Sequence, residues 1–304
     1  MISGLGGSRL RGATRAAGAL ASCGRSSRPV MGDGGNPMYQ AYWGLREMPF
    51  SGRAEWRWFY CSPTHEEALA RLQFLVEQRR RVGLLLGASG SGKSLMLELF
   101  AGQLRSQGRP VVKMNLTGVG GDELLWLVAL QLGIAPAAQL PRYALWQQLT
   151  DRLAEYRYQG LESVLLADDA DAARTESLTT LLRLVEEQSG PESTLVVVLA
   201  ARPDRAARIG PALLERAELR IDLEPWEEAD TARFVQQVQA EAGRAESVFD
   251  HGALRRLHEL AEGVPRRIRQ LADLSLAAGA GRRLERIDAE TVESVYHELG
   301  VVEV

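Results

Sequence analysis

Eight consecutive residues carry the strongest chemical signal in the chain. Together they fit the pattern G-x-x-x-x-G-K-[ST] in full, and they are Gly87, Ala88, Ser89, Gly90, Ser91, Gly92, Lys93 and Ser94. Glycines allow successive N–H groups to point at one anion. A lysine at this spacing reaches the β- and γ-phosphates, and the last hydroxyl can ligate Mg²⁺. We therefore predict that these eight residues bind a nucleoside triphosphate, ATP with Mg²⁺, with Lys93 also catalytic and Ser94 on the metal.

Two adjacent acids could complete a hydrolytic site. Asp168 and Asp169 directly follow the apolar run Val164–Ala167, and Asp171 adds a third carboxylate nearby. An acid at the carboxyl end of a buried strand can meet the metal, so we predict that Asp168 binds Mg²⁺ through water. Asp169 would orient or deprotonate the attacking water. Glutamate is usual at this second position, and because aspartate is one methylene shorter, the rate of hydrolysis is open.

Two arginines are candidates for contact with the γ-phosphate. Arg202 follows the apolar run Thr194–Ala201, where a polar side chain could sense the phosphate or simply be solvated. Arg266 follows Pro265, and proline suits the first turn of a helix. An arginine in that turn of a mobile lid could reach the γ-phosphate. We assign Arg202 to nucleotide binding and Arg266 to catalysis.

The composition is that of an ordinary globular protein. The chain has 304 residues, of which 45% are hydrophobic and 25% charged, with a net charge of −3 that gives no argument for a nucleic acid or membrane partner. Two cysteines and four scattered histidines form no metal-ligand spacing, so each histidine is expected at the surface or at a helix cap. No apolar run reaches the roughly 20 residues that span a bilayer. These features predict a cytoplasmic protein.

Hydrophobic periodicity predicts an α/β domain followed by helices. Short apolar runs that read as strands alternate with helical patterns, which is typical of a parallel sheet covered on both faces; the five strands are expected at Val82–Leu86, Pro110–Leu116, Ser163–Ala167, Thr194–Ala201 and Leu219–Leu223. After Pro225 only helical patterns remain, expected at Glu227–Ala242, Ala253–Glu262, Pro265–Ala278 and Ala289–Leu299. A further helix is expected to start at an N-cap on Thr64. We predict an αβα domain over residues 38–224 and a helical lid over residues 225–304.

The first 37 residues differ from the rest because they are rich in Gly, Ser, Ala and Arg and carry no acid before Asp33. Three interpretations are open: a transit-like segment, a disordered arm that contacts nucleic acid, or translation from a start placed too far upstream. We favour the third, because the globular pattern begins at Met38. Mass spectrometry of the N-terminal peptide of the native protein would distinguish these three interpretations.

At family level these motifs resemble an AAA+ ATPase. The phosphate loop, the two-acid strand and Gly-Val-Pro-Arg at 263–266 belong to that pattern. More narrowly, the chain resembles the ATPase module of the general secretion pathway protein A (ExeA-type) family, and the segments that carry this resemblance are 38–50 (MYQAYWGLREMPF), 62–69 (SPTHEEAL) and 198–204 (VLAARPD). The resemblance implies an AAA+ fold with an αβα nucleotide domain and a helical lid, ATP hydrolysis coupled to assembly, and an aromatic N-terminal segment that packs near the adenine.

The resemblance also frames the partners and the alternatives. Such ATPases usually act as rings in which a neighbour's arginine completes each site, and Arg216 and Arg220 are the candidates. Departures from the family are Asp169 in place of Glu and Ala201-Arg202 in place of Gly-Gln. We therefore predict an ATPase that remodels or regulates a protein partner, in a role related to secretion or the cell envelope and peripheral to the inner membrane through that partner. Two alternatives stay open. One is an ATP-dependent switch with little hydrolysis, and the other is a DNA-binding transposition regulator (TniB-like) that uses the Arg-rich stretch 266–286.

Overall fold

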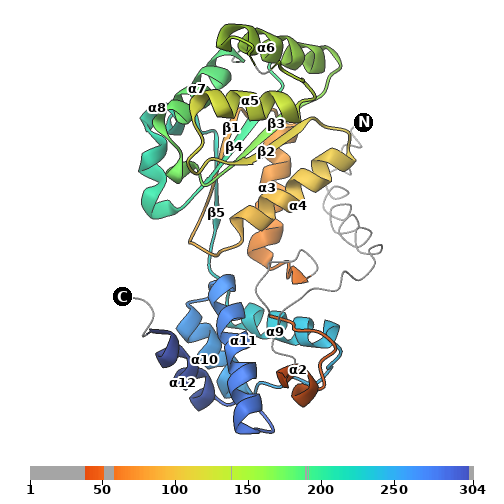
Figure 1. Cartoon of the computed structure of the whole chain (residues 1–304), viewed down its shortest axis with the longest axis vertical. Coiled ribbons are helices and arrows are strands. Elements are labelled where there is room, and N and C mark those ends of the chain that lie inside the picture. Colours follow the sequence, from red (N-terminus) through yellow and green to blue (C-terminus); the bar gives the residue numbers. More distant parts are fainter. Residues whose placement is uncertain (1–37, 51–57, 138, 189, 191, 301–304) are drawn as a thin grey trace, which may run out of the picture.

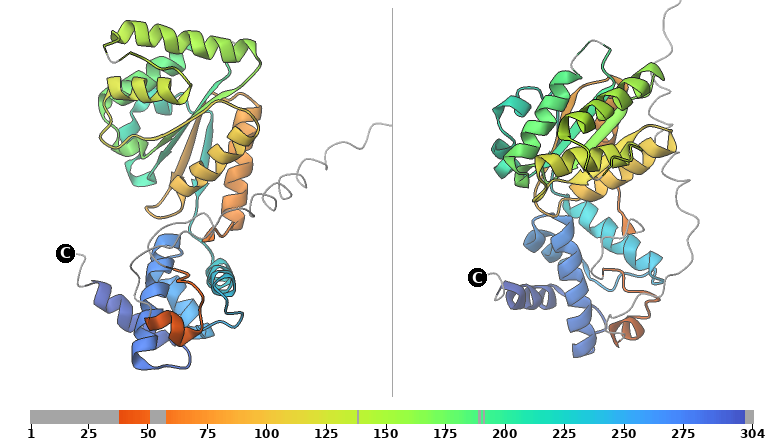
Figure 2. Two further views of the ribbon diagram at one scale, coloured as in Figure 1. Left: turned by 45° about the vertical axis from the view of Figure 1, so that its right-hand side comes forward. Right: turned by 45° about the horizontal axis from the view of Figure 1, so that its top comes forward.

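The computed structural model describes residues 38–50, 58–137, 139–188, 190 and 192–300. The predicted extension over residues 1–37 lies outside the described residues. The chain forms an α/β body and, beyond it, a helical region that lies at one end of the sheet (Figures 1 and 2). Two short segments connect these parts: residues 58–62 before α3 (Pro63–Glu77), and residues 224–227 after β5 (Leu219–Leu223).

The α/β body is built on a five-stranded parallel sheet in the order β2-β3-β4-β1-β5. The strands besides β5 are β1 (Val82–Gly87), β2 (Val111–Asn115), β3 (Ser163–Asp168) and β4 (Leu195–Ala201). Every residue of β1, β3 and β4 is buried, as expected for strands covered on both faces. The predicted fold class, five strands included, is confirmed.

Helices cover both faces of the sheet. One apolar cluster joins one face to α5 (Gly121–Gln131), α6 (Arg142–Tyr158) and α7 (Thr175–Glu187). A second cluster joins the opposite face to α3 and α4 (Lys93–Ser106). Three short elements, η2 (Ala170–Ala172), η3 (Pro203–Ile209) and α8 (Pro211–Leu214), follow β3 and β4. Because all strands are parallel, the loops that leave β1, β3 and β4 meet at one edge of the sheet.

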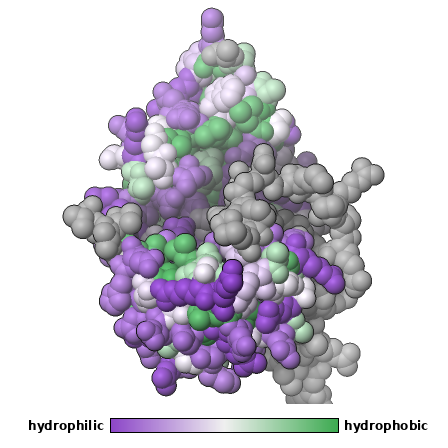
Figure 3. Space-filling model, turned by 60° about the horizontal axis from the view of Figure 1, so that its bottom comes forward, coloured by the Kyte–Doolittle hydropathy of each residue, from purple (hydrophilic) through white to green (hydrophobic). Residues whose placement is uncertain are grey.

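The helical region consists of α9 (Glu228–Glu241), α10 (His251–Ala261), α11 (Pro265–Arg282) and α12 (Ala289–Gly300). It also takes in α2 (Met38–Trp43), although α2 comes first in the described sequence, because Tyr39 and Trp43 are buried in the same apolar cluster as these four helices. In the view of Figure 3, hydrophilic side chains dominate the described surface of this end and hydrophobic residues appear in separate patches, as expected when the helices bury their apolar faces together.

The helix α11 is longer than predicted, and the part that was not predicted contacts α2. Its expected end at Ala278 is wrong: the helix continues through two glycines to Arg282. A Cβ on Gly279 would lie 2.9 Å from Cζ2 of Trp43, so this glycine makes room for the indole. The Trp43 ring is 2% exposed and its Nε1–H donates to the Leu276 carbonyl at 2.8 Å. Burial of this ring offsets the cost of glycine within a helix, about 1 kcal/mol relative to alanine.

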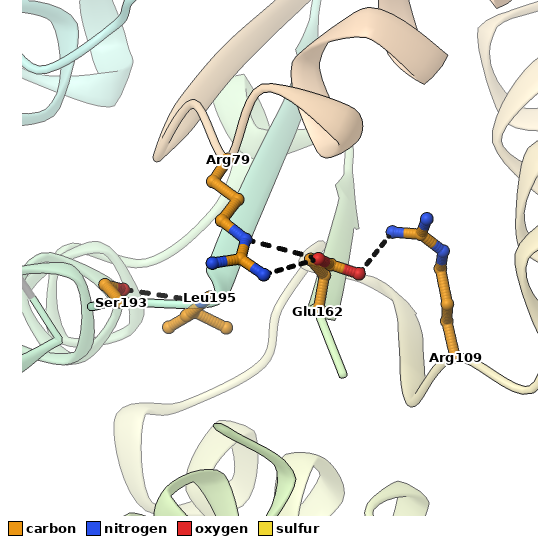
Figure 4. A network of polar contacts seen from close by, with 5 residues as sticks. All are labelled: Arg79, Arg109, Glu162, Ser193 and Leu195. Atoms are coloured by element: carbon orange, nitrogen blue, oxygen red, sulfur yellow. Dashed lines mark hydrogen bonds and ion pairs between the residues drawn. The ribbon is translucent and has the colours of Figure 1, made fainter. Parts of the chain in front are cut away.

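A carboxylate links two loops at the edge of the sheet opposite the phosphate loop. Glu162, just before β3, accepts hydrogen bonds from Arg79 Nε and Nη2 at 3.2 Å each and from Arg109 Nη1 at 2.7 Å (Figure 4). The Glu162 and Arg109 side chains are only 15% and 19% exposed. Glu162 thereby joins the turn after α3 to the chain leading into β2.

Replacement of Glu162 by alanine should lower the free energy of unfolding by about 1–2 kcal/mol, because it leaves a half-buried guanidinium without its partner. Urea denaturation followed by far-UV circular dichroism measures this. Glu67→Ala is the matched control: Glu67 pairs with Arg71 on the surface of α3, with its side chain 62% exposed, and its loss should change stability by less than about 0.5 kcal/mol. Equal effects of the two changes would contradict a structural role for Glu162.

Candidate nucleotide-binding site

The phosphate loop lies between β1 and α4, as predicted from its flanking residues. Gly90 and Gly92 have φ angles of 86° and 101°, in the region that favours glycine. Lys93 is 7% exposed, and its Nζ donates to the carbonyls of Gly87 at 2.7 Å and Ala88 at 3.0 Å. Burial lowers the pKa of Lys93, while the nearby carboxylates of Asp168, Asp169 and Asp171 raise it. The ammonium group therefore faces an acidic edge.

The acidic pair lies where β3 ends. Asp168 is 4% exposed and its Oδ1 accepts the Asp169 N–H at 3.0 Å. Asp169 adopts the left-handed region with φ 51°, an uncommon conformation that asparagine and aspartate tolerate best. Its Oδ2 accepts a hydrogen bond of 2.7 Å from Nδ2 of Asn115, the last residue of β2. The carboxylate of Asp169 is thus held beside the phosphate loop.

Asn115 is a functional candidate that the sequence reasoning missed. It pairs in register with Asp168 across β2 and β3, and its Oδ1 accepts the Thr117 N–H at 2.8 Å. Its position at the end of a predicted strand was the available signal, because the carboxyl ends of parallel strands form one edge. Which strand neighbours β3, however, is not readable from the residues.

Arg202 lies at the same edge, where β4 ends between β1 and β3. Its guanidinium forms an ion pair with Asp204, with Nη2 to Oδ2 at 2.7 Å. Its backbone N–H donates to Oδ1 of the buried Asp171 at 3.4 Å. Arg202 therefore faces the cavity with one carboxylate already on its guanidinium.

The helical region reaches the phosphate loop through the first turn of α11. The Arg266 N–H donates to the Gly90 carbonyl at 3.3 Å. A Cβ on Gly90 would lie 2.7 Å from Cβ of Arg266, so the loop and the helix start touch at their backbones. Arg267, the next residue, instead pairs with Glu262 at 2.6 Å on the surface. The structure thus brings Arg266 to the loop, as its sequence position suggested.

Aromatic side chains form the other wall of a cavity of about 710 Å³ between the body and the helical region. Trp226 lies at the centre of this wall, with ring centroids 5.3 Å from Tyr60 and 5.1 Å from Phe234. The Tyr60 hydroxyl donates to Asp230 of α9 at 2.9 Å, and burial raises the pKa of Tyr60. The cavity combines this apolar wall with the polar residues of the loop; the members of the aromatic wall are Phe50, Trp58, Phe59, Tyr60, Trp226 and Phe234.

The start of α3 differs from the prediction. The predicted N-cap at Thr64 is wrong: Ser62 is the N-cap, its Oγ accepts the His65 N–H, and Pro63 occupies the first turn, as proline prefers. His65 was expected at the surface or at a cap, but it is 3% exposed and its ring contacts the phosphate loop. The Ser-Pro pair was the sequence signal for the cap, whereas nothing local signalled the loop contact.

Comparison with known families agrees with this geometry. The pattern described as "AAA domain" matches residues 76–209, a range that contains the phosphate loop, both acids and Arg202. Residues 76–209 are thus similar to AAA domains. The resemblance inferred from the sequence is thereby confirmed.

The chain is also similar to one curated protein, over a longer stretch than residues 76–209. It is 28% identical to General secretion pathway protein A of Aeromonas hydrophila over 254 residues, which cover 82% of this chain and 46% of the relative. The chain thus spans about half the length of that relative. The similarity extends past the AAA domain, because 254 residues exceed the range of the family match.

Several solved structures share the fold of this chain at low sequence identity. Cdc6p of Pyrobaculum aerophilum has a TM-score of 0.62 at 20% identity, covering 82% of this chain and 70% of that one. The ORC1 protein of Aeropyrum pernix, solved in complex with DNA, has a TM-score of 0.59 at 19% identity, covering 80% and 67%. The RuvB branch migration motor of Thermotoga maritima has a TM-score of 0.54 at 12% identity, covering 83% and 73%.

The donor set of this site suits a magnesium ion that is shared with a phosphate. Ser94 supplies a hydroxyl at the start of α4 and Asp168 a buried carboxylate at the end of β3, and oxygen donors are those that Mg²⁺ prefers. Among the described residues no group of three or more His, Cys, Asp and Glu side chains could hold a metal by itself. Mg²⁺ typically binds through one or two carboxylates plus substrate phosphates and waters, so the residues fit the ion only together with a nucleotide.

The two arginines that were predicted to complete the site of a neighbouring copy lie outside the cavity of their own chain. Arg216 pairs with Glu186 of α7, and Arg220, in the edge strand β5, pairs with Asp222 at 2.9 Å. Neither side chain lines the cavity. Across the described residues, no helix is both long and apolar enough to cross a lipid bilayer.

Proposed function

We propose that this chain binds ATP with Mg²⁺ in the cavity between the α/β body and the helical region, and hydrolyses it. The observation that carries the proposal is the composition of that single cavity: Lys93 and Ser94 from the loop, Asp169 from the end of β3, Arg202 from the end of β4 and Arg266 from α11 all line it. These residues come from four separate elements. A largely apolar wall combined with a few polar groups is typical of small-molecule sites, and here the polar groups include the phosphate loop.

The proposed reaction is an in-line attack of water on the γ-phosphorus. Loop N–H groups and the Lys93 ammonium bind the phosphates, which requires Lys93 to exchange the Gly87 and Ala88 carbonyls for phosphate oxygens. Mg²⁺, held by Ser94 and Asp168, would neutralise charge on the β- and γ-phosphates. Asp169 orients the water and accepts its proton as the new P–O bond forms. The bond to the bridging oxygen breaks, and ADP leaves with that electron pair.

The lid gives the proposed reaction a mechanical output. We assign residues 38–224 to the ATPase unit and residues 225–304 to the lid, with α2 packed on the lid. Arg266 would contact the γ-phosphate and lose that contact after hydrolysis, so the α11–loop contact would differ between the ATP and ADP states. Because α11 carries Asp273, whose Oδ1 accepts the Tyr39 hydroxyl at 2.6 Å, such a movement would carry α2 along.

The role that this output serves is proposed by similarity. Similarity to General secretion pathway protein A over 82% of the chain supports a homo-oligomeric ATPase that remodels or regulates a protein complex, related to secretion or the cell envelope. It would act from the cytoplasm, at the inner membrane when its partner is there. Arg216 or Arg220 of one copy would complete the site of the next. A nucleic acid partner is the weaker alternative, since solved structures at 20% identity or less support the fold alone.

A second function, an ATP-dependent switch with little hydrolysis, is favoured by one observation. Asp169 is shorter than the usual glutamate, and its Oδ2 is already engaged by Asn115 at 2.7 Å. The hydrogen bond from Asn115 therefore competes with a water molecule for this carboxylate oxygen. In a switch, ATP binding alone would dock Arg266 and change the assembly state.

Phosphate release and ATP binding, measured on the same preparation, separate these functions. Steady-state release should require Mg²⁺ and fall to the background when EDTA removes the metal, while calorimetry should give a Kd for Mg²⁺-ATP in the micromolar range typical of nucleotide sites. Binding without release would support the switch. Absence of both binding and release would contradict the nucleotide site itself.

A further inference from the structure

His65 contacts the phosphate loop and lines the cavity, but the reaction scheme does not use it. It lies in the first turn of α3, and its ring centroid is 5.5 Å from Phe59 and 6.1 Å from Trp226 of the cavity wall. Its Nε2 lies 3.2 Å from the Ser91 carbonyl oxygen, and a Cβ on Gly92 would approach the same nitrogen to 3.1 Å. The imidazole therefore touches the residues that directly precede Lys93.

The partners of the ring determine which nitrogen carries the proton. A carbonyl oxygen only accepts hydrogen bonds, so Nε2 must be the donor to Ser91. In the neutral imidazole, Nδ1 is then an acceptor, and it takes the Ser62 hydroxyl proton at 2.8 Å. Ser62 Oγ in turn accepts the His65 N–H at 3.4 Å. Burial lowers the pKa of His65, which favours this neutral tautomer.

The hydrogen bond to Ser91 orients a single peptide group of the loop. Gly92 is the N-cap of α4, and its own carbonyl accepts the first helical hydrogen bond, from Met96 N at 2.8 Å. The Ser91 carbonyl precedes the helix and is therefore available to His65. Because a trans peptide is planar, a carbonyl that faces His65 turns the Gly92 N–H to the opposite side. Phosphate loops present successive backbone N–H groups of this kind to the bound anion.

We propose that His65 is a positioning residue for nucleotide binding: its Nε2–H holds the Ser91 carbonyl so that the Gly92 N–H and the Lys93 side chain are preorganised for the phosphates. This role deepens the proposed function and rests on it. His65 also lines the cavity, and the proposed role is carried by its hydrogen bond to Ser91, which acts on the nucleotide through the Ser91–Gly92 peptide. Its contribution is to affinity, which preorganisation increases.

Two substitutions at this position separate the two hydrogen bonds of the ring. In His65→Gln the amide nitrogen reaches about as far as Nε2 and can donate to Ser91, whereas the Ser62 contact is lost. In His65→Asn the amide reaches only as far as Nδ1, so the Ser62 contact is kept and the Ser91 contact is lost. The Kd for Mg²⁺-ATP, measured by calorimetry, should rise about tenfold or more in His65→Asn, the effect of one unsatisfied buried carbonyl. It should stay within about threefold of wild type in His65→Gln.

Controls distinguish positioning from general stability. Ser62→Ala removes the other ring contact and should leave the Kd within about threefold of wild type. His258→Asn is the matched histidine control, because His258 hydrogen-bonds Thr231 Oγ1 at 3.0 Å within the helical region, outside the cavity lining. It should lower the Tm without changing the Kd. Thermal melts without nucleotide measure how much stability His65→Asn and His65→Gln each lose. If His65 had a merely structural role, two variants with similar Tm values would also have similar Kd values.

The outcomes are distinct for each hypothesis. A wild-type Kd for His65→Asn, or an equal loss in His65→Gln and His65→Asn, overturns the positioning role while leaving the proposed function intact. No binding by wild type overturns the proposed function itself. If His65→Asn does not fold, ¹⁵N correlation spectra of the wild-type imidazole decide: a protonated Nε2 whose resonance shifts on addition of Mg²⁺-ATP supports the role, and an unprotonated Nε2 or an unchanged resonance overturns it.

Discussion

Replacement of Lys93 by alanine should reduce phosphate release from Mg²⁺-ATP to background, with kcat/KM at least about 10²–10³-fold lower than that of wild type. Lys93 is the buried cation at the loop, 7% exposed, and its Nζ already donates to two loop carbonyls. With a nucleotide bound, the same donors would serve the β- and γ-phosphates. Without the ammonium group, charge that develops on the phosphates loses its nearest fixed counter-charge.

The chain offers a well-matched control for this change. Lys113 is the only other lysine in the sequence. It lies in the edge strand β2, where it pairs with Glu98 of α4, and it does not line the cavity. Lys113→Ala should keep kcat/KM within about twofold of wild type, since a largely surface ion pair contributes little. Turnover by Lys93→Ala above a tenth of the wild-type rate would contradict the assigned site.

Replacement of Asp169 by asparagine should separate hydrolysis from binding. The two side chains have the same shape, and an asparagine carbonyl can still accept the hydrogen bond from Asn115 Nδ2. The negative charge and the ability to accept a proton from water are lost. We expect kcat to fall about 10²–10⁴-fold, the usual contribution of a general base, while the Kd for Mg²⁺-ATP changes less than about threefold. Single-turnover phosphate release together with calorimetry measures both quantities.

Asp151→Asn provides the comparison, because Asp151 is an exposed residue of α6 that does not line the cavity. It should match wild type in both measurements. A wild-type kcat for Asp169→Asn would exclude Asp169 as the base. An Asp169→Asn protein that also fails to bind ATP would instead assign this carboxylate to binding. Asp169→Glu tests the short side chain directly, since a faster rate would mean that aspartate limits proton transfer here.

Local patterns predicted the fold better than they predicted the surroundings of the site. The five strands and their parallel arrangement followed from short apolar runs that alternate with helical periods, because burial on both faces leaves a continuous apolar signal. The end of α11 was misjudged, because the two glycines near its C-terminus suggest a stop when read locally. Gly279 instead accommodates Trp43, and no local pattern reveals a contact between α2 and α11, whose residues Trp43 and Leu276 lie 233 residues apart in the sequence.

The candidate site divides in the same way. The phosphate loop, Asp168 and Asp169 were identifiable because each belongs to a run of consecutive residues whose spacing the chemistry dictates. Asn115 and His65 were not, because each acts across a separation, 54 residues from Asn115 to Asp169 and 26 residues from His65 to Ser91. Whether an asparagine or a histidine meets a partner at such a distance depends on strand order and helix packing.

The sequence by itself determined the phosphate loop, the acid pair and the alternation of strands and helices, because each depends on neighbours within a few residues. Only the tertiary structure decided which residues surround the phosphate loop Gly87–Ser94. Parallel pairing of β2 with β3 brought Asn115 to Asp169, and packing of α3 against the body brought His65 to Ser91. Docking of α11 brought Arg266 to Gly90. These contacts depend on how whole elements bury their apolar faces together, a property that no short segment carries alone.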